Sequence, residues 1–61
     1  MGGNFMKYVV TNCTCINDNY YNSEPMEYEQ ALELYSAITR QAKRGLREFP
    51  DLLDDNGNII M

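Results

Sequence analysis

One long amphipathic stretch, from Glu27 to Arg44, constrains the fold of this chain more than any other part of its sequence. It reads EYEQALELYSAITRQAKR, with apolar residues at spacings of three and four. In an α-helix that spacing stacks the apolar side chains on one face and leaves the opposite face polar. The pattern therefore predicts a helix whose apolar face packs on a flat layer of other elements. The residues of that face are Tyr28, Ala31, Tyr35, Ile38 and Ala42.

Boundary signals mark both ends of this predicted helix. With Glu27 at the N-cap, the amide of Gln30 can reach back to the cap, and Met26 lies over Ala31 as a hydrophobic staple. Acidic residues fall in the first turns and basic residues in the last turns, which complements the helix dipole. Gly45 suits the position that follows a helix, because glycine adopts a left-handed backbone there without a steric penalty.

Segments on both sides of the helix have the composition of strands. Residues 5–11, FMKYVVT, are rich in β-branched and aromatic side chains and predict a strand, which residues 12–16 either prolong or follow as a second strand. Asn17-Asp18-Asn19 predicts a turn, because Asn and Asp tolerate left-handed backbone. We expect residues 5–16 to form a hairpin with a short return arm at residues 20–22.

The last ten residues leave two pairings open. Asn56-Gly57 between apolar pairs is a strong hairpin signal, so Leu52-Leu53 can pair with residues 59–61 as a ribbon. Alternatively, residues 59–61 join the N-terminal strand. In both cases the run Ile59-Ile60-Met61 is expected to be buried, because a loose apolar segment favours aggregation. The elements together predict an α+β fold: a small two-layer domain with a two- or three-stranded antiparallel sheet packed on one central amphipathic helix, in the order β(β)αβ.

The length of 61 residues predicts one domain, with residues 1–4 disordered or a non-native leader before Met6. A chain this short buries only about 60% of the surface that its unfolded form exposes, so its stability is marginal unless something adds to it. Leu32 and Leu34 lie on opposite flanks of the helix, and Leu34 and Ala37 widen its apolar sector beyond what one small sheet needs. This surplus predicts a homodimer formed through the helix flank.

The net charge argues against nucleic acid as a partner. The chain carries a formal charge of −4, whereas a protein that neutralises nucleic-acid phosphates needs a positive surface. Nucleic acid is therefore an unfavoured partner, and a protein with a basic surface is favoured. The sequence has neither a signal-peptide pattern nor an apolar run long enough to cross a bilayer. We expect a cytoplasmic protein that is not bound to a membrane.

The residue inventory predicts a protein that is not an enzyme and binds no cofactor. The chain has no histidine for proton transfer near neutral pH, and no nucleophile stands beside an evident base. Cys13 and Cys15 fall short of the four ligands of a zinc site, so we expect two free, partly buried thiols. The acidic segment from Asp51 to Asn58 has leucines where a calcium loop needs ligands, which indicates an exposed turn.

Two sets of residues are candidates for binding a partner. The segment NDNYYN at 17–22 combines tyrosine, which offers large and rigid contact area, with asparagine, which offers adaptable hydrogen bonds. With the neighbouring acids it forms the predicted partner-binding set: Asp18, Tyr20, Tyr21, Glu24, Glu27, Glu29 and Glu33. The second set is a basic group spaced for one polar helical face, a candidate contact for phosphate or an acidic partner: Arg40, Lys43, Arg44 and Arg47.

These observations favour a small, acidic, non-catalytic module that binds another protein and acts as a stoichiometric inhibitor or regulator. Phage and mobile-element proteins that block a host defence nuclease, such as anti-CRISPR proteins, are built on this scale. In that hypothesis the acids face a basic, nucleic-acid-binding groove and the tyrosines act as anchors. The alternative is a dimeric nucleic-acid-binding or transcription-regulating module that uses the basic set. A ribbon–helix–helix version of it needs a second helix after Gly45, which Pro50 disfavours.

Overall fold

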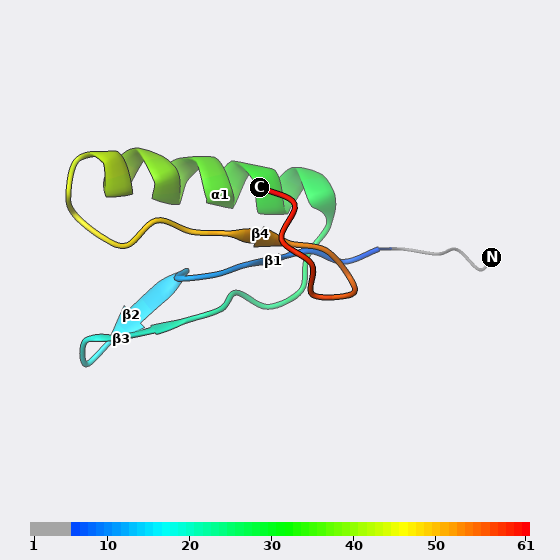
Figure 1. Ribbon diagram of the computed structural model, residues 1–61, viewed down its shortest axis with the longest axis horizontal. Helices are drawn as coiled ribbons and strands as arrows, with labels where there is room; N and C mark the ends of the chain where they lie inside the picture. Colours follow the sequence, from blue (N-terminus) through cyan, green and yellow to red (C-terminus); the bar gives the residue numbers. More distant parts are fainter. Residues whose placement is uncertain (1–5) are drawn as a thin grey trace.

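Helix α1 (Tyr28–Lys43) packs on a small antiparallel sheet of two strands, β1 (Val9–Val10) and β4 (Leu52–Leu53), in the computed structural model of the chain (Figure 1). The structure describes residues 6–61. Two further strands, β2 (Thr14–Ile16) and β3 (Asn19–Tyr21), form a separate antiparallel hairpin. The predicted α+β class is therefore confirmed, with the strands divided between two sheets.

The predicted helix is confirmed to within one residue at each end, and its C-terminus has a Schellman motif. Gly45 has a φ of 78°, and its N–H donates to the carbonyl oxygen of Ala42 at 2.9 Å. The N–H of Leu46 donates to the carbonyl oxygen of Gln41 at 3.0 Å. These two bonds satisfy carbonyls that the helix end would leave unpaired, and the left-handed residue turns the chain back under the helix.

The N-terminus of the helix is simpler than the predicted capping box. Glu27 occupies the N-cap position as expected, but its side chain makes no capping hydrogen bond. Met26 does pack against the cluster that contains Ala31, as a staple residue would.

The sheet under the helix is extended on both edges by single bridges. In the centre Val9 pairs with Leu53 and Val10 pairs with Leu52. On the β1 side, Tyr8 and Met26 exchange two backbone hydrogen bonds of 2.7 and 2.9 Å. On the β4 side, Leu53 is bridged to Ile59. Four extended segments thus lie side by side, and we call them together with α1 the body of the molecule.

The C-terminal residues combine parts of the two predicted pairings. The ribbon of Leu52-Leu53 with residues 59–61 forms, since the N–H of Ile60 donates to the carbonyl oxygen of Leu52 at 2.8 Å. The segment that joins the N-terminal strand, however, is Leu52-Leu53, so the prediction that residues 59–61 take this place is wrong. The predicted burial of the run is also wrong: Ile59 is 63% exposed, and Ile60 and Met61 are each 44% exposed. They occupy the edge of the sheet, where the helix does not cover them fully.

The predicted N-terminal strand is shorter than expected and is not continuous with the hairpin. Its first residue, Phe5, lies outside the described residues, as does the predicted leader at residues 1–4. Within them, β1 is preceded by the single bridge at Tyr8 and ends before Asn12, which has a φ of 54°. A left-handed residue breaks an extended strand, so the chain turns there before β2 begins.

The core lies between α1 and the sheet. Val10 and Leu52 face the helix from neighbouring strands, and Ala31 and Ile38 meet them from the apolar face of α1. Ala42 is buried one turn further along the helix. Within the described residues no helix is long and apolar enough to cross a membrane.

Candidate protein-binding surfaces

The β2–β3 hairpin stands apart from the body, and we call residues Thr14–Tyr21 the hairpin arm. No Cα atom of its strands lies within 8 Å of a Cα atom of α1, β1 or β4. Figure 1 shows the arm beyond β1, on the side away from the helix. The predicted turn is confirmed at Asn17 and Asp18, whose φ values of 53° and 67° give the left-handed pair of a type I′ turn. This turn matches the twist of the two strands and lets so short a hairpin close.

A partly buried arginine, Arg47, connects the arm to the body. Nη2 of Arg47 donates to the carbonyl oxygens of Asn12, at 2.7 Å, and of Cys13. Nη1 of the same guanidinium donates to Oε1 of Gln41, at the end of the helix, at 3.1 Å. Nearby, Nδ2 of Asn12 donates to the carbonyl oxygen of Phe49 at 2.9 Å. The residues that follow the helix thus hold the base of the arm through side-chain hydrogen bonds.

Backbone hydrogen bonds fix the other side of that base. The N–H of Cys13 donates to the carbonyl oxygen of Tyr21 at 2.8 Å, which prolongs the hairpin by one bond. The N–H of Ser23 donates to the carbonyl oxygen of Val10 at 2.8 Å, and Oγ of Ser23 accepts from the N–H of Val10 at 2.9 Å. Ser23 therefore joins the strand leaving the arm to the central strand of the body.

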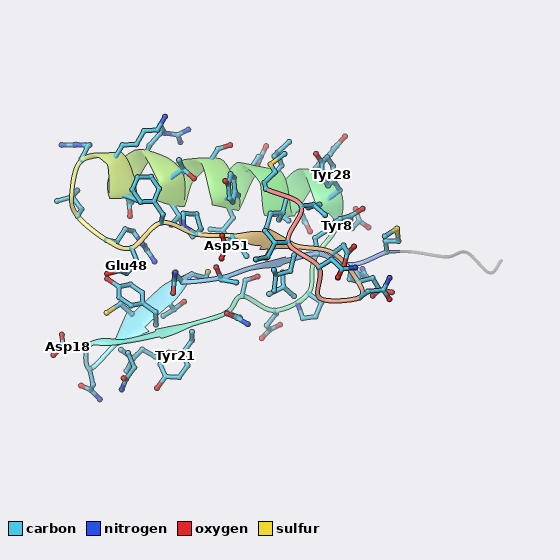
Figure 2. All side chains as sticks on the ribbon, viewed as in Figure 1. Tyr8, Asp18, Tyr21, Tyr28, Glu48 and Asp51 are labelled. Atoms are coloured by element: carbon cyan, nitrogen blue, oxygen red, sulfur yellow. The ribbon has the colours of Figure 1, made fainter. Side chains whose placement is uncertain are left out.

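The tyrosines predicted as anchors point to opposite faces of the arm. Cys15 pairs with Tyr20, and Thr14 pairs with Tyr21, so alternation separates the two rings. Tyr20 is half-buried, whereas Tyr21 is 50% exposed and in Figure 2 points away from the helix. Asp18 lies at the exposed tip. Of the predicted residues on the arm, Tyr21 and Asp18 are therefore exposed and Tyr20 is half-buried.

The structure does not bring all seven predicted partner-binding residues together. The four glutamates, Glu24, Glu27, Glu29 and Glu33, are exposed on the approach to α1 and on its first half. Figure 1 shows that the helix begins at the end of the molecule opposite the arm. Two surfaces result: an acidic surface around the start of the helix, and a surface on the arm whose single charge is Asp18 at the tip.

Shallow grooves flank Glu33 on both sides of the helix, each of about 500 Å³. One is lined by Met26, Gln30 and Leu34, and the other by Leu32, Ser36 and Arg40. The leucines that predicted a homodimer line these grooves. Leu34 also packs against the core of its own chain, and Leu32 and Ala37 are half-buried, so the body itself uses part of the apolar surplus.

Three of the four basic residues keep the predicted position on the exposed surface of the helix. Arg40 and Lys43 belong to its last turn, and Arg44 is the C-cap. Arg47 lies beyond the helix and is partly buried, so its predicted place on a polar helical face is wrong. The pattern mispredicted it because the 3.6-residue period was extended across Gly45, where the backbone turns.

Apart from Tyr21, the exposed large apolar side chains were not recognised as surface residues from the sequence. Tyr8 and Tyr28 form a T-shaped pair with ring centroids 5.1 Å apart, and Tyr28 remains 41% exposed. The two rings meet because the segment just before β1 lies beside the start of α1. No local sequence pattern indicates this contact. Among the described residues, the exposed large apolar side chains are Met6, Ile16, Tyr21, Tyr28, Leu46, Phe49, Ile59, Ile60 and Met61.

The acidic turn after β4 is held by its own first carboxylate. Oδ1 of Asp54 accepts hydrogen bonds from the backbone N–H groups of Asn58 and Asn56, both at 2.9 Å. These donors, Asn58 first, lower the pKa of Asp54 because they favour its charged form. Hydrogen bonds within the turn therefore account for the conformation of this acidic segment.

The two cysteines are free thiols. Cys13 is half-buried and packs against the core, as predicted, whereas Cys15 is exposed on the arm. Residues 6–61 hold no group of three or more side chains of the types that bind metal ions. Comparisons with protein-family models, with curated protein sequences and with solved structures find no match to this chain.

Proposed function

We propose that this protein acts by binding another protein, as a stoichiometric inhibitor or regulator without catalytic chemistry of its own. The observation that carries the proposal is the imbalance between its buried and exposed apolar residues. Five hydrophobic residues, two of them alanines, and Pro50 are buried in the described chain, whereas nine large hydrophobic side chains are exposed. Exposed apolar patches on a small protein commonly mark interaction sites.

The acidic charge supports a partner with a basic surface. The net charge is −4, and Glu24, Glu27, Glu29 and Glu33 present carboxylates around the first half of the helix. A nucleic-acid-binding protein has such a basic surface, so inhibition of a host defence nuclease, for example a CRISPR effector, is the specific form of this proposal. Steering by charge would raise the association rate at low salt.

The proposal is tested by the hydrodynamic mass of the tagged protein in extracts of the organism that encodes it. We expect it to sediment in a complex of fixed stoichiometry with a second protein, well above the mass of one or two copies. Sedimentation at the mass of the free chain at every salt concentration would contradict the proposal.

The specific form is tested with purified CRISPR effector nucleases and labelled target DNA. We expect at least one nuclease to lose cleavage when the protein is added at an equimolar ratio, because a stoichiometric inhibitor acts one to one. A gel shift with random duplex DNA is the control, and we expect no shift. A shift that weakens with salt would favour the nucleic-acid alternative instead.

A further inference from the structure

The outer face of the hairpin arm is apolar and exposed. Cross-strand pairing of Thr14 with Tyr21, and of Ile16 with Asn19, puts these four side chains on one face. Ile16 is 53% exposed and Tyr21 is 50% exposed. A two-stranded hairpin is at best marginally stable in water on its own, so uncovered apolar surface on it is costly unless a partner covers it.

The strands of the arm are uncharged, and one acidic side chain, Asp18, stands at its tip. Residues 12–17 and 19–23 contain no charged side chain, and Asp18 stands alone at the tip. Glu48 and Asp51 are exposed on the connector that is hydrogen-bonded to the base of the arm, on the other side of the arm from Tyr21 (Figure 2). The nearest base, Arg47, directs its guanidinium to the carbonyl oxygens of Asn12 and Cys13. The arm therefore offers an apolar face with one negative charge at its tip.

The dimensions of this face argue against a second copy of the chain as its occupant. Its four side chains fall far short of the roughly 20–30 residues per side of a stable interface. Two copies would also bring the Asp18 carboxylates of both arms to the same interface. A concave site covers much more of a protruding hairpin, because it encloses the face and both strand edges together.

The strand edges alone do not suit the arm for sheet extension either. Each strand has three residues, and alternate residues direct their backbone groups toward the other strand. Few N–H and C=O groups therefore remain to pair with an added strand. Side-chain contact through the outer face is the favoured mode.

We infer that the outer face of the hairpin arm inserts into a concave site of a partner protein, with an apolar floor for Ile16 and Tyr21 and basic side chains at its rim for Asp18. This inference rests on the proposed function and makes it more specific. It assigns the main contact to the arm instead of the acidic start of the helix. It also replaces Tyr20, which is half-buried on the opposite face of the arm, with Ile16 as the second anchor.

Photo-crosslinking in cells of the encoding organism tests the inference position by position. A benzophenone amino acid replaces one residue at a time: Ile16 or Tyr21 on the outer face, Cys15 on the inner face, Glu29 on the helix, and Ile59 as a control. Ile59 matches Ile16 in type and is similarly exposed, but belongs to the body. We expect one discrete adduct from positions 16 and 21, at least tenfold stronger than from positions 15, 29 and 59.

Each other outcome overturns the inference. Adducts from position 29 alone would leave the proposed function standing and move the contact to the helix. An adduct of about twice the 7.1 kDa chain would identify a second copy as the occupant. Absence of adducts at all positions would contradict the inference, and with a monomer in the sedimentation experiment it would contradict the proposed function as well.

The predicted basic charge at the rim of the partner's concave site is tested with the crosslinked partner, once it has been identified and purified. We expect Asp18→Lys to raise the dissociation constant about fivefold or more at low salt. Loss of an exposed ion pair weakens binding by up to about that factor, and the lysine adds repulsion from the basic rim. Asp55→Lys is the matched control, since Asp55 is an exposed acid in the other turn. Equal affinities of the two variants would contradict a basic rim around the arm.

Discussion

The body and the hairpin arm both use very short antiparallel strands, but only the body covers them. In the body, β1 and β4 are two residues long, yet Val10 and Leu52 are fully buried because the helix lies on them and further segments flank them. In the arm, the three-residue strands leave five of six side chains exposed. The comparison teaches that strand length does not decide stability here. The second layer does, because it removes apolar surface from water.

The arm depends on local geometry and on its attachment instead. Its type I′ turn fixes the register, and Arg47 and Ser23 fix its base. Such a segment can open without unfolding the core, since it contributes little to apolar burial. We therefore expect mutations in the body to act on global stability and mutations in the arm to act locally.

The largest effect is expected from Leu52→Ala. Leu52 is fully buried, lies opposite Val10 of β1 and is hydrogen-bonded to the C-terminal segment, so truncation leaves a cavity in the centre of the core. We expect a loss of about 2–5 kcal/mol in the free energy of unfolding, measured by urea denaturation. Leu46→Ala is the control: Leu46 is 65% exposed, and its loss should be within about 0.5 kcal/mol. Equal losses would mean that the core is not where we place it.

An intermediate effect is expected from Arg47→Ala, which removes the link between body and arm. The carbonyl oxygens of Asn12 and Cys13 lose their charged donor, at a cost of about 1–3 kcal/mol. We expect chymotrypsin to cleave after Tyr20 or Tyr21 severalfold faster than in the unchanged protein. Arg44→Ala removes the same charge from the exposed C-cap and should leave the cleavage rate unchanged.

A smaller effect, confined to the arm, is expected from two substitutions at the turn. Asp18→Val and Asp18→Gly remove the same charge, but a β-branched residue disfavours the φ of 67° that glycine accepts. We expect valine to cost the arm about 1–2 kcal/mol and glycine to preserve it. Backbone chemical shifts of residues 14–21 report the difference. A matching fall in the melting temperature of the body would contradict the separation of the two regions.

The smallest effect is expected from acidification of the turn after β4. The folded pKa of Asp54 is below its ordinary value, so its stabilising contribution is present at neutral pH and is lost as the pH falls through that lowered pKa. We expect the amide resonances of Asn56 and Asn58 to titrate below the ordinary range of aspartate. In Asp54→Asn the amide oxygen can still accept these bonds, and the resonances should no longer titrate. A midpoint in the ordinary range would contradict the two bonds to Oδ1.

The sequence predicted those parts of the fold that depend on local pattern. The helix period, Gly45 as its end, and the Asn17-Asp18 turn are read from neighbouring residues, and all three are confirmed. The partners of Leu52-Leu53 and the exposure of Ile59-Ile60-Met61 depend on which segments meet across the chain. Two-residue strands carry too little alternation to specify that choice.

The candidate surfaces divide in the same way. The exposure of Asp18 and Tyr21 follows from a turn that the sequence signals. The position of Arg47 and the separation of the arm from the acidic helix start depend on where the chain turns at Asn12 and Gly45. Backbone reversals of this kind displace every later residue from the face that a regular period assigns to it.

Native-state amide hydrogen exchange tests the independence of the arm most directly. The account predicts two classes of amide in one experiment. The amides of Leu52 and Ile60 and of the middle of α1 should exchange only through global unfolding, with a denaturant dependence equal to that of the whole chain. The amide of Cys13, bonded to Tyr21, should exchange through smaller openings with little denaturant dependence. A single protection value shared by Cys13 and Leu52 would contradict the account, because the arm would then belong to the cooperative core.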